Sequence, residues 1–465
     1  MTKLLALMLI LATGTMLSCS SSSTSDSQNH GISKNGTLKL DVKKYTLSNG
    51  LRLLVVENPQ LPIYTYNTFF DVGGRYEEAG TTGATHFLEH MMFKGAKKYG
   101  PHKFDTFIES NGGSTNAYTT FDSTVYYQNM PSHTLATIID MEADRLQHIL
   151  LDPKAFEKER AVVLEERKYR YENSPKGQLF LAMMQSVFDK TPYGGSVIGD
   201  EKDVKNLDRA RMRKFFDRFY TPDNAIVVVV GDVKASEVYS MVKEKYGNIP
   251  SSKGLKAFKE KMDSKERYAF KGKFKREIKI KGQSPSPIFT IGYKGIKIGE
   301  EESFVLDILS SVLGDGDSSY FNQLYVKNKK PLLSGISVAN YTLKNNGVFF
   351  FSGDLLKRTN LKRFKRKILR DIKKSCDIGI TDRSVQKTKN QYMIQYFHEL
   401  QSNSGVASFL GLRENFFNDY AYYKKELEIY KSITTDQVKT ACKKLFAKND
   451  YIFLSVWGKH PKGKK

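Results

Sequence analysis

The sequence contains few cysteines, a single tryptophan and no long apolar run beyond its first residues. Only three of its 465 residues are cysteines: Cys19, Cys376 and Cys442. The last two have no histidine neighbours, which excludes a zinc knuckle, and two cysteines in so long a chain do not make the disulfide framework of small secreted domains. We expect Cys376 and Cys442 to be buried structural residues.

Acidic residues are scarce relative to basic ones, because 50 Asp and Glu face 73 Lys and Arg, a formal net charge of +23. This balance would suit nucleic acid, acidic peptides or an anionic membrane surface, and charge alone does not choose among them. The length and the 40% hydrophobic content predict a globular chain of about two to four domain-sized units.

Residues 1–18 are predicted to be a signal peptide, because Lys3 precedes the apolar run of residues 4–11, which is too short to span a bilayer. The text MLSC resembles a bacterial lipoprotein signal, in which Cys19 would be lipidated and become the first mature residue. Plain secretion with cleavage nearby is the alternative. The Ser-rich residues 19–39 are predicted to be a flexible tether. We therefore expect an exported lipoprotein, anchored in a membrane and facing the periplasm or the cell surface.

The order of predicted elements favours an α+β fold of two homologous domains. In residues 40–250 an Asn-Gly hairpin at positions 49 and 50 is followed by helices around 81–94 and 103–110, one strand at 114–127, helices at 135–150 and 154–172, and a buried strand at 224–233. Residues 277–465 give a weaker copy of this order, and the Lys- and Ser-rich residues 251–276 are the expected linker. Each domain is predicted to be a mainly antiparallel sheet packed with helices.

One helix of the second domain, at residues 361–374, combines an apolar stripe with many basic groups. Such a helix could bind a membrane or nucleic acid. We favour a core-packed helix with a solvated cationic face, because a domain helix needs the apolar stripe in any case.

The text HFLEH, residues 86–90, suggests a metal site. Residues i and i+4 share a helix face, so His86 and His90 can present their imidazoles to one point, with Glu89 beside them. Two neutral imidazoles suit zinc, and an adjacent carboxylate can accept the proton of an activated water. The alternative is an ordinary surface turn of a helix.

A catalytic zinc site needs a third protein ligand. Glu159 and Glu166 are seven residues apart and share a helix face with Val162 and Val163 between them, whereas Glu165 points elsewhere. One carboxylate could reach the metal while the other hydrogen-bonds to a ligand. A solvated charged helix is the alternative, and it explains the valines less well.

The segments GATHFLEHMMFKG, GGSTNAYTTFDSTVYY and ERAVVLEE carry a family resemblance. From about residue 41 to 459 the chain resembles the insulinase/pitrilysin family of zinc metallopeptidases, with the inverted HxxEH motif, in particular the short members related to mitochondrial processing peptidase. The resemblance implies that His86, His90 and Glu166 bind Zn²⁺, that Glu89 is the general base and that Glu159 supports the site. It also places the Asn116-Ala117 step in a strand that borders the active site, and an edge strand can bind a peptide by strand addition. Alternatively, these two residues are part of the core.

The function that follows is a zinc-dependent endopeptidase acting on peptides or unfolded polypeptide segments. In the family an Arg and a Tyr seven residues apart stabilise the oxyanion, and Tyr325 and Leu332 stand at those places here. We therefore expect a homologous partner subunit without zinc that carries the Arg/Tyr pair, or a homodimer, and no nucleic-acid partner. The alternative is a non-enzymatic, lipid-anchored binding or scaffold protein with the same fold.

Overall fold

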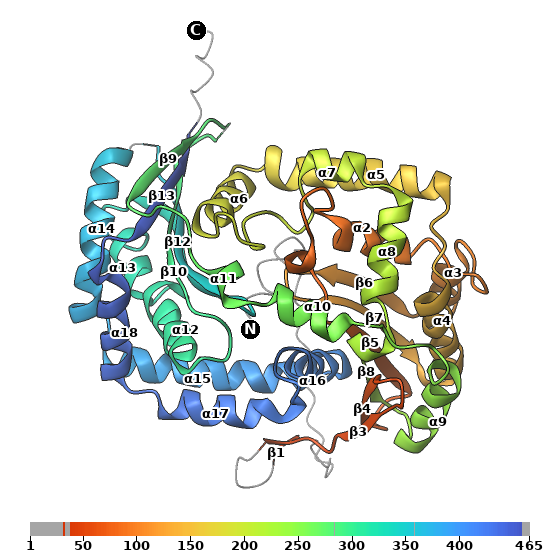
Figure 1. Cartoon of the computed structure of the whole chain (residues 1–465). Coiled ribbons are helices and arrows are strands. Elements are labelled where there is room, and N and C mark those ends of the chain that lie inside the picture. Colours follow the sequence, from red (N-terminus) through yellow and green to blue (C-terminus); the bar gives the residue numbers. More distant parts are fainter. Residues whose placement is uncertain (1–30, 33–37, 283, 358, 458–465) are drawn as a thin grey trace. The chain divides into compact units, whose positions relative to one another are not determined.

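The computed structural model describes residues 31–32, 38–282, 284–357 and 359–457 (Figure 1). The predicted signal peptide, Cys19 and most of the predicted tether lie outside these residues. Among the described residues, 31–32 and 38–41 belong to one unit, and those from 42 to 457 belong to another. In the first, the short strands β1 (Gly31–Ile32) and β2 (Leu38–Lys39) pair antiparallel.

Residues 42–250 build the first sheet. Its strands are β3 (Lys43–Thr46), β4 (Arg52–Glu57), β5 (Ile63–Phe70), β6 (Ser114–Thr119), β7 (Thr124–Pro131) and β8 (Ala225–Gly231), in the spatial order β3-β4-β8-β5-β7-β6. Only β4 and β8 pair in parallel. The helices of this half are α2 (Ala84–Met92), α3 (Lys103–Ser110), α4 (Leu135–His148), α5 (Pro153–Arg167), α6 (Pro175–Val187), α7 (Glu201–Asn206), α8 (Arg209–Phe219) and α9 (Ala235–Tyr246). A π-helical turn, η3 (Lys168–Glu172), continues α5, and 3-10 turns lie at η1 (Gly74–Tyr76), η2 (Ser132–Thr134) and η4 (Pro222–Asn224).

The second sheet follows two connecting helices, α10 (Leu255–Met262) and α11 (Lys265–Tyr268), which form within the predicted linker. Its strands are β9 (Arg276–Ile280), β10 (Ile288–Lys294), β11 (Leu333–Thr342), β12 (Gly347–Leu355) and β13 (Tyr451–Val456), in the order β11-β12-β10-β13-β9. Only β13 and β9 pair in parallel. The helices are α12 (Glu301–Gly314), α13 (Tyr320–Tyr325), α14 (Leu361–Ile378), α15 (Asp382–Glu399), α16 (Asn403–Phe417), η5 (Tyr420–Tyr422), α17 (Tyr423–Ser432) and α18 (Thr435–Ala447).

The predicted α+β class and its two sheet-plus-helix halves are confirmed, and so is the Asn-Gly hairpin, which joins β3 and β4. The single strand predicted at 114–127 is wrong. The chain turns back at residues 120–123, because the Thr120 hydroxyl accepts hydrogen bonds from the backbone N–H groups of Asp122 and Ser123 at 3.1 and 2.9 Å. Such a turn converts one alternating run into the hairpin β6–β7.

The two halves exchange a helix. Helix α6 of the first half packs on β10 and β13, and α16 of the second half packs on β5 and β8. The contact of α16 needs a glycine, because a Cβ added at Gly411 would lie 2.1 Å from the Phe69 ring. A Cβ added at Gly292 in β10 would lie 3.2 Å from Val187 of α6, a tight contact that a small shift could relieve. The close approach lets each helix complete the core of the other half.

A buried ion-pair network also joins the halves. Arg75, which is fully buried, pairs with Asp71 at 2.8 Å and with Asp122 at 3.0 Å. Lys344, from the turn between β11 and β12, pairs with Asp71 at 3.1 Å. Burial alone would raise the pKa of Asp71, but the charges of Lys344, Arg75 and Lys259 hold this pKa well below its ordinary value.

Cys376 and Cys442 are buried, as predicted, and they form a disulfide between α14 and α18, which the sequence did not predict. Their Cα atoms are 5.5 Å apart. The second half is therefore covalently closed over 66 residues of sequence.

Candidate metal centre

Helix α2 is held at its N-terminus by a carboxylate from outside the helix. Gly83, the residue before the helix, has a φ of +87°, which favours glycine. The carboxylate of Glu77 accepts hydrogen bonds from the backbone N–H groups of Gly83 and Thr85, both at 2.8 Å. Burial raises the pKa of Glu77 to about 7, and the two N–H donors oppose that rise. Glu77 was not predicted from the sequence, because it lies too far upstream to be an ordinary helix cap.

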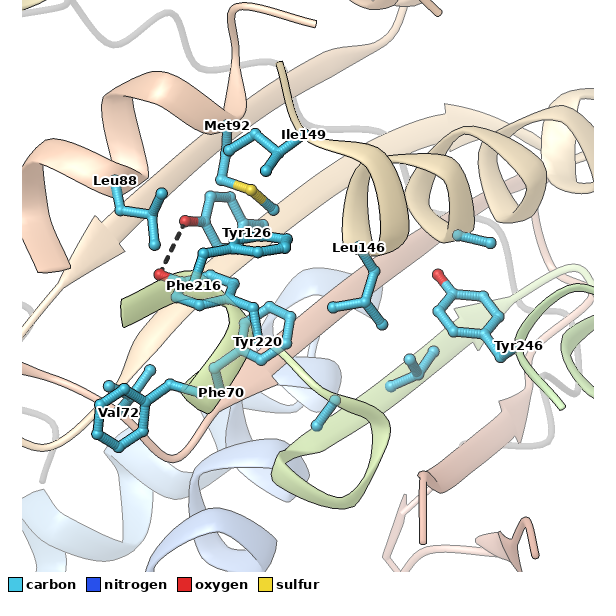
Figure 2. Packing of buried hydrophobic residues seen from close by; sticks show 14 of the residues in the cluster. Phe70, Val72, Leu88, Met92, Tyr126, Leu146, Ile149, Phe216, Tyr220 and Tyr246 are labelled. Carbon is cyan, nitrogen blue, oxygen red and sulfur yellow. Dashed lines mark hydrogen bonds between the residues drawn. The ribbon is translucent and has the colours of Figure 1, made fainter. Parts of the chain in front are cut away.

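The two faces of α2 have different roles. Leu88 and Met92, one turn apart, pack into the core beside Tyr126 of β7, as Figure 2 shows. His86, Glu89 and His90 occupy the other positions, and α2 packs against α5. The apolar face therefore fixes the rotation of the helix and directs the motif side chains toward α5.

The structure brings His86 and His90 of the HxxEH motif together with Glu166, the third ligand that the family resemblance implies. One possible ligand atom from each of the three lies within 4.8 Å of the others. Oε2 of Glu166 is 3.6 Å from Nε2 of His86 and 3.4 Å from Nε2 of His90. Burial lowers the pKa of His86 to about 3, so this ring is neutral at pH 7. Burial would raise the pKa of Glu166, but its hydrogen bond to His90 and the charge of Arg170 bring it to about 2, so the carboxylate is ionised.

These donors fit a zinc ion. Two imidazoles and one carboxylate form the ligand set of a catalytic zinc site that keeps a position open. The neutral ring of His86 and the ionised carboxylate of Glu166 have the protonation states that coordination requires. Burial would lower the pKa of His90, but hydrogen bonds to Glu166 and Glu159 raise it, so this ring must release its proton when a metal binds.

A second layer of contacts orients the three side chains. Oε2 of Glu159 lies 3.1 Å from Nδ1 of His90, which leaves Nε2 of that ring for a metal, and Lys94 pairs with Oε1 of Glu159 at 2.6 Å. Arg170 in η3 pairs with Oε1 of Glu166 at 2.6 Å, which leaves Oε2 facing the histidines. Lys94 and Arg170 were missed by the sequence analysis, although each lies four residues after a predicted ligand, a spacing that shares a helix face.

Glu89 is half-buried beside the histidines. The hydroxyl of Thr119, the last residue of β6, donates a hydrogen bond to its carboxylate. Burial raises the pKa of Glu89, and this moves the group toward the range of a general base that must also return a proton. Thr119 was not predicted, because nothing in the spacing shows that the end of β6 meets α2.

Strand β6 is one of the two edge strands of the first sheet, with β7 as its neighbour. Asn116 is exposed and its side chain accepts a hydrogen bond from the backbone N–H of Ala117 at 2.8 Å. Ala117 is partly buried against the core. The edge position suits strand addition, whereas the partial burial of Ala117 fits the core alternative.

Helix α5 corrects one detail of the prediction. Val163 is buried between the two carboxylates, but Val162 is 48% exposed and does not belong to their face. The side chain of Glu165 is 76% exposed and points away from the site, as predicted.

Family models match both halves of the chain. The model of the insulinase family, peptidase family M16, matches residues 52–201, and that of the peptidase M16 inactive domain matches residues 206–392. The zinc protease PqqE of Helicobacter pylori is 30% identical over 78% of this chain and 81% of its own length. The chain belongs to the insulinase (M16) family.

Other M16 relatives share less sequence. The beta subunit of mitochondrial-processing peptidase from Blastocladiella emersonii is 28% identical over 65% of this chain and 64% of its own. A crystal structure of a protease from Helicobacter pylori superposes with a TM-score of 0.82 at 25% identity, covering 90% of this chain and all of the other. An M16 inactive-domain structure from Pseudomonas fluorescens has a TM-score of 0.77 at 16% identity, covering 90% and 98% of the two chains, a likeness of fold.

Tyr325 and Leu332, which stand where the resemblance implies an Arg/Tyr pair, belong to the second half of the chain. Tyr325 is buried in α13 and its hydroxyl donates to Asp371 at 2.8 Å, so it is fixed within the second half. Leu332 is apolar and can donate no side-chain hydrogen bond.

Proposed function

We propose that this M16 chain is a zinc-dependent endopeptidase that hydrolyses peptides or unfolded polypeptide segments. The observation that carries the proposal is the convergence of His86, His90 and Glu166 on one point with Glu89 beside them. A bound zinc ion would supply Lewis-acid polarisation of the scissile carbonyl and a more acidic water at pH 7.

The chain's own residues perform the proton transfers. Glu89, oriented by Thr119, accepts a proton from the attacking water and later donates it to the leaving amine. Glu159 fixes the ring of His90, and Arg170 fixes the carboxylate of Glu166. The free edge of β6 aligns an extended substrate through backbone hydrogen bonds, which tolerates many sequences.

A homologous partner subunit completes the proposed enzyme. Tyr325 and Leu332 cannot supply the cation and hydroxyl that would stabilise an oxyanion. A second M16 chain carrying an Arg/Tyr pair would supply both groups. Similarity to a protein named as a subunit of mitochondrial-processing peptidase supports this arrangement, and a homodimer is the second possible assembly.

The proposed location is outside the cytoplasm, with Cys19 as a lipidated anchor in a membrane. The disulfide between Cys376 and Cys442 supports export, because such bonds persist in oxidising compartments. Among the residues that the structure covers, none of the helices has the length and apolarity needed to cross a membrane.

The test compares the wild type with Glu89→Gln and with Glu165→Gln, a matched change at an exposed glutamate. Metal content is measured by mass spectrometry, and cleavage of a quenched peptide is followed with and without a candidate Arg/Tyr homologue. We expect about one zinc per chain in all three proteins, and a loss of cleavage of about 10²–10⁴-fold in Glu89→Gln alone. Zinc without cleavage under any pairing would favour the non-enzymatic binding protein, and absence of zinc would refute the site.

A further inference from the structure

The positive charge of the chain lies almost entirely in its second half. Residues 42–250 contain 27 Lys and Arg and 27 Asp and Glu, so they are formally neutral. Residues 251–465 contain 43 Lys and Arg against 21 Asp and Glu. The two halves share a fold, so the fold itself does not require this charge.

Two equivalent helices show the difference most clearly. Helix α4 follows β7 and α14 follows β12, and each of these strands is the second of a hairpin at the same place in its sheet. Helix α4 contains three acidic residues and one arginine, whereas α14 contains eight Lys and Arg and two Asp. The cations of α14 are therefore additional to what the helix needs for packing.

The cations of α14 form one exposed stripe. Phe364, Ile368 and Ile372 are buried on the opposite side. The exposed cations follow helical spacing: Lys362, Arg363, Arg366, Arg370, Lys373 and Lys374. Arg370 contacts Asp371 at 3.4 Å, and the other five form no ion pair within the part of the chain that the structure describes.

Strand β9 and the residues around it extend this stripe. Lysines alternate on its exposed side, at Lys271, Lys273, Lys275, Lys279 and Lys281. Lys365 on the flank of α14 pairs with Glu277 of β9 at 2.7 Å, which joins helix and strand into one surface (Figure 1). Lysines on an edge strand also oppose unwanted strand pairing, so β9 alone would not carry an inference.

Two exposed apolar side chains border these cations. Trp457, the only tryptophan, is 59% exposed and directly follows β13, whose last residue pairs with Ile280 of β9. Ile378, the last residue of α14, is 66% exposed. Tryptophan prefers the interface between water and lipid headgroups.

We propose that this surface, the six exposed cations of α14 and the five lysines around β9, here called the basic face, binds the anionic headgroups of a phospholipid bilayer. The stripe on α14 spans roughly 18 Å at 1.5 Å per residue, which exceeds the Debye length of about 8 Å in physiological salt. An extended charged plane can neutralise all these cations at once, and each adds to the attraction. The bordering Trp457 and Ile378 favour lipid over an acidic polypeptide or nucleic acid. The inference depends neither on Cys19 nor on the proposed peptidase activity.

The experiment measures co-sedimentation of the chain without its predicted signal peptide, residues 19–465, with vesicles of phosphatidylcholine alone or with about one third phosphatidylglycerol. Cys19→Ser is present throughout, so that no lipid anchor contributes. The test variant combines Arg366→Glu, Arg370→Glu and Lys373→Glu. A matched control combines Lys97→Glu, Lys202→Glu and Lys243→Glu, three exposed cations of the neutral half. Circular dichroism and the unfolding temperature confirm that both variants fold.

We expect the wild type and the control to bind the anionic vesicles and not the neutral ones, and the test variant to bind at least tenfold more weakly. Binding should fall steeply between 50 and 500 mM salt, as screening predicts. Equal weakening by both variants would mean that overall charge alone acts and would overturn the proposal. So would equal binding to both vesicle types, or saturable binding to polyglutamate or an oligonucleotide without binding to vesicles.

Discussion

The two halves of the molecule share one topology but not one chemistry. The strand order β4-β8-β5-β7-β6 of the first sheet matches β9-β13-β10-β12-β11 of the second, with the parallel pair at the same end. Helix α2 lies between β5 and β6, and α12 lies between β10 and β11 in sequence. Helix α12 contains no histidine, and its buried residues are aliphatic, Phe, Ser and Gly. The two halves provide the same place in the fold, and three side chains make it a candidate metal centre in the first half alone.

The halves also differ at their edges. Strand β3 pairs with β4 in the first sheet, so β4 is not an edge strand. Strand β9, which takes the place of β4 in the second sheet, is an edge strand. The exposed lysines of the basic face lie on this edge strand and beside it. The first half thus has the features of a reaction site and the second half those of a charged docking surface, although both have the same topology.

The largest expected effect is on the candidate metal site, the feature that distinguishes the first half from the second. Glu166→Gln should lower zinc affinity about a thousandfold. A zinc-binding free energy of roughly 10–16 kcal/mol, divided among three ligands, gives on the order of 4 kcal/mol for each ligand. Glu165→Gln, one residue away on the exposed face, should leave the affinity unchanged. Competition titration with a zinc chelator measures both. Equal affinities for the two variants would remove Glu166 from the ligand set.

The next effect tests the link between the halves. Asp71→Asn should destabilise the chain by about 2–3 kcal/mol, because it leaves Arg75 and Lys344 with one fewer buried partner. The pKa of Asp71 is held below its ordinary value, so its contribution is complete above about pH 4 and declines as the pH falls below 3.8 toward the folded-state pKa. Urea unfolding in the presence of a chelator, at pH 6 and pH 3, measures the difference.

Asp217→Asn, at an exposed position paired with Arg213 at 3.4 Å, is the control and should change stability little. A difference between wild type and Asp71→Asn that stayed the same at pH 3 would show that the carboxylate charge does not join the halves.

The sequence predicts the candidate zinc ligands but few of the side chains that hold them in place. His86, His90, Glu159 and Glu166 follow from helical spacing together with the family resemblance, because contacts along a helix are local. Glu77 and Thr119 reach α2 from other elements, and the exchanged helices α6 and α16 pack on the sheet of the opposite half. Such contacts depend on tertiary packing, which has no period in the sequence. The hairpin at residues 120–123 was missed for a related reason, since strict alternation continues across the turn.

The smallest expected effect concerns Glu77, and it sharpens the comparison between α2 and α12. Helix α12 begins after Glu300 without a side-chain cap, whereas Glu77 holds two N–H groups at the start of α2. Glu77→Gln keeps the size but replaces one acceptor oxygen with a donor, which cannot accept the second N–H. The start of α2 should loosen and misplace His86, and zinc affinity should fall about tenfold, the lower end of the effect of outer contacts on metal sites.

Glu142→Gln is the matched control, because Glu142 is also buried and pairs with Arg145 at 2.7 Å in α4, a helix that holds no ligand. We expect it to lower the free energy of unfolding at saturating zinc without changing the zinc dissociation constant. The two variants therefore separate positioning from stability: Glu77 positions the metal site only if its variant weakens zinc binding by more than its loss of stability explains. If zinc affinity fell in proportion to stability in both variants, the hydrogen bonds from Glu77 would have no specific role in metal binding. The difference between α2 and α12 would then be only that α2 carries the candidate ligands.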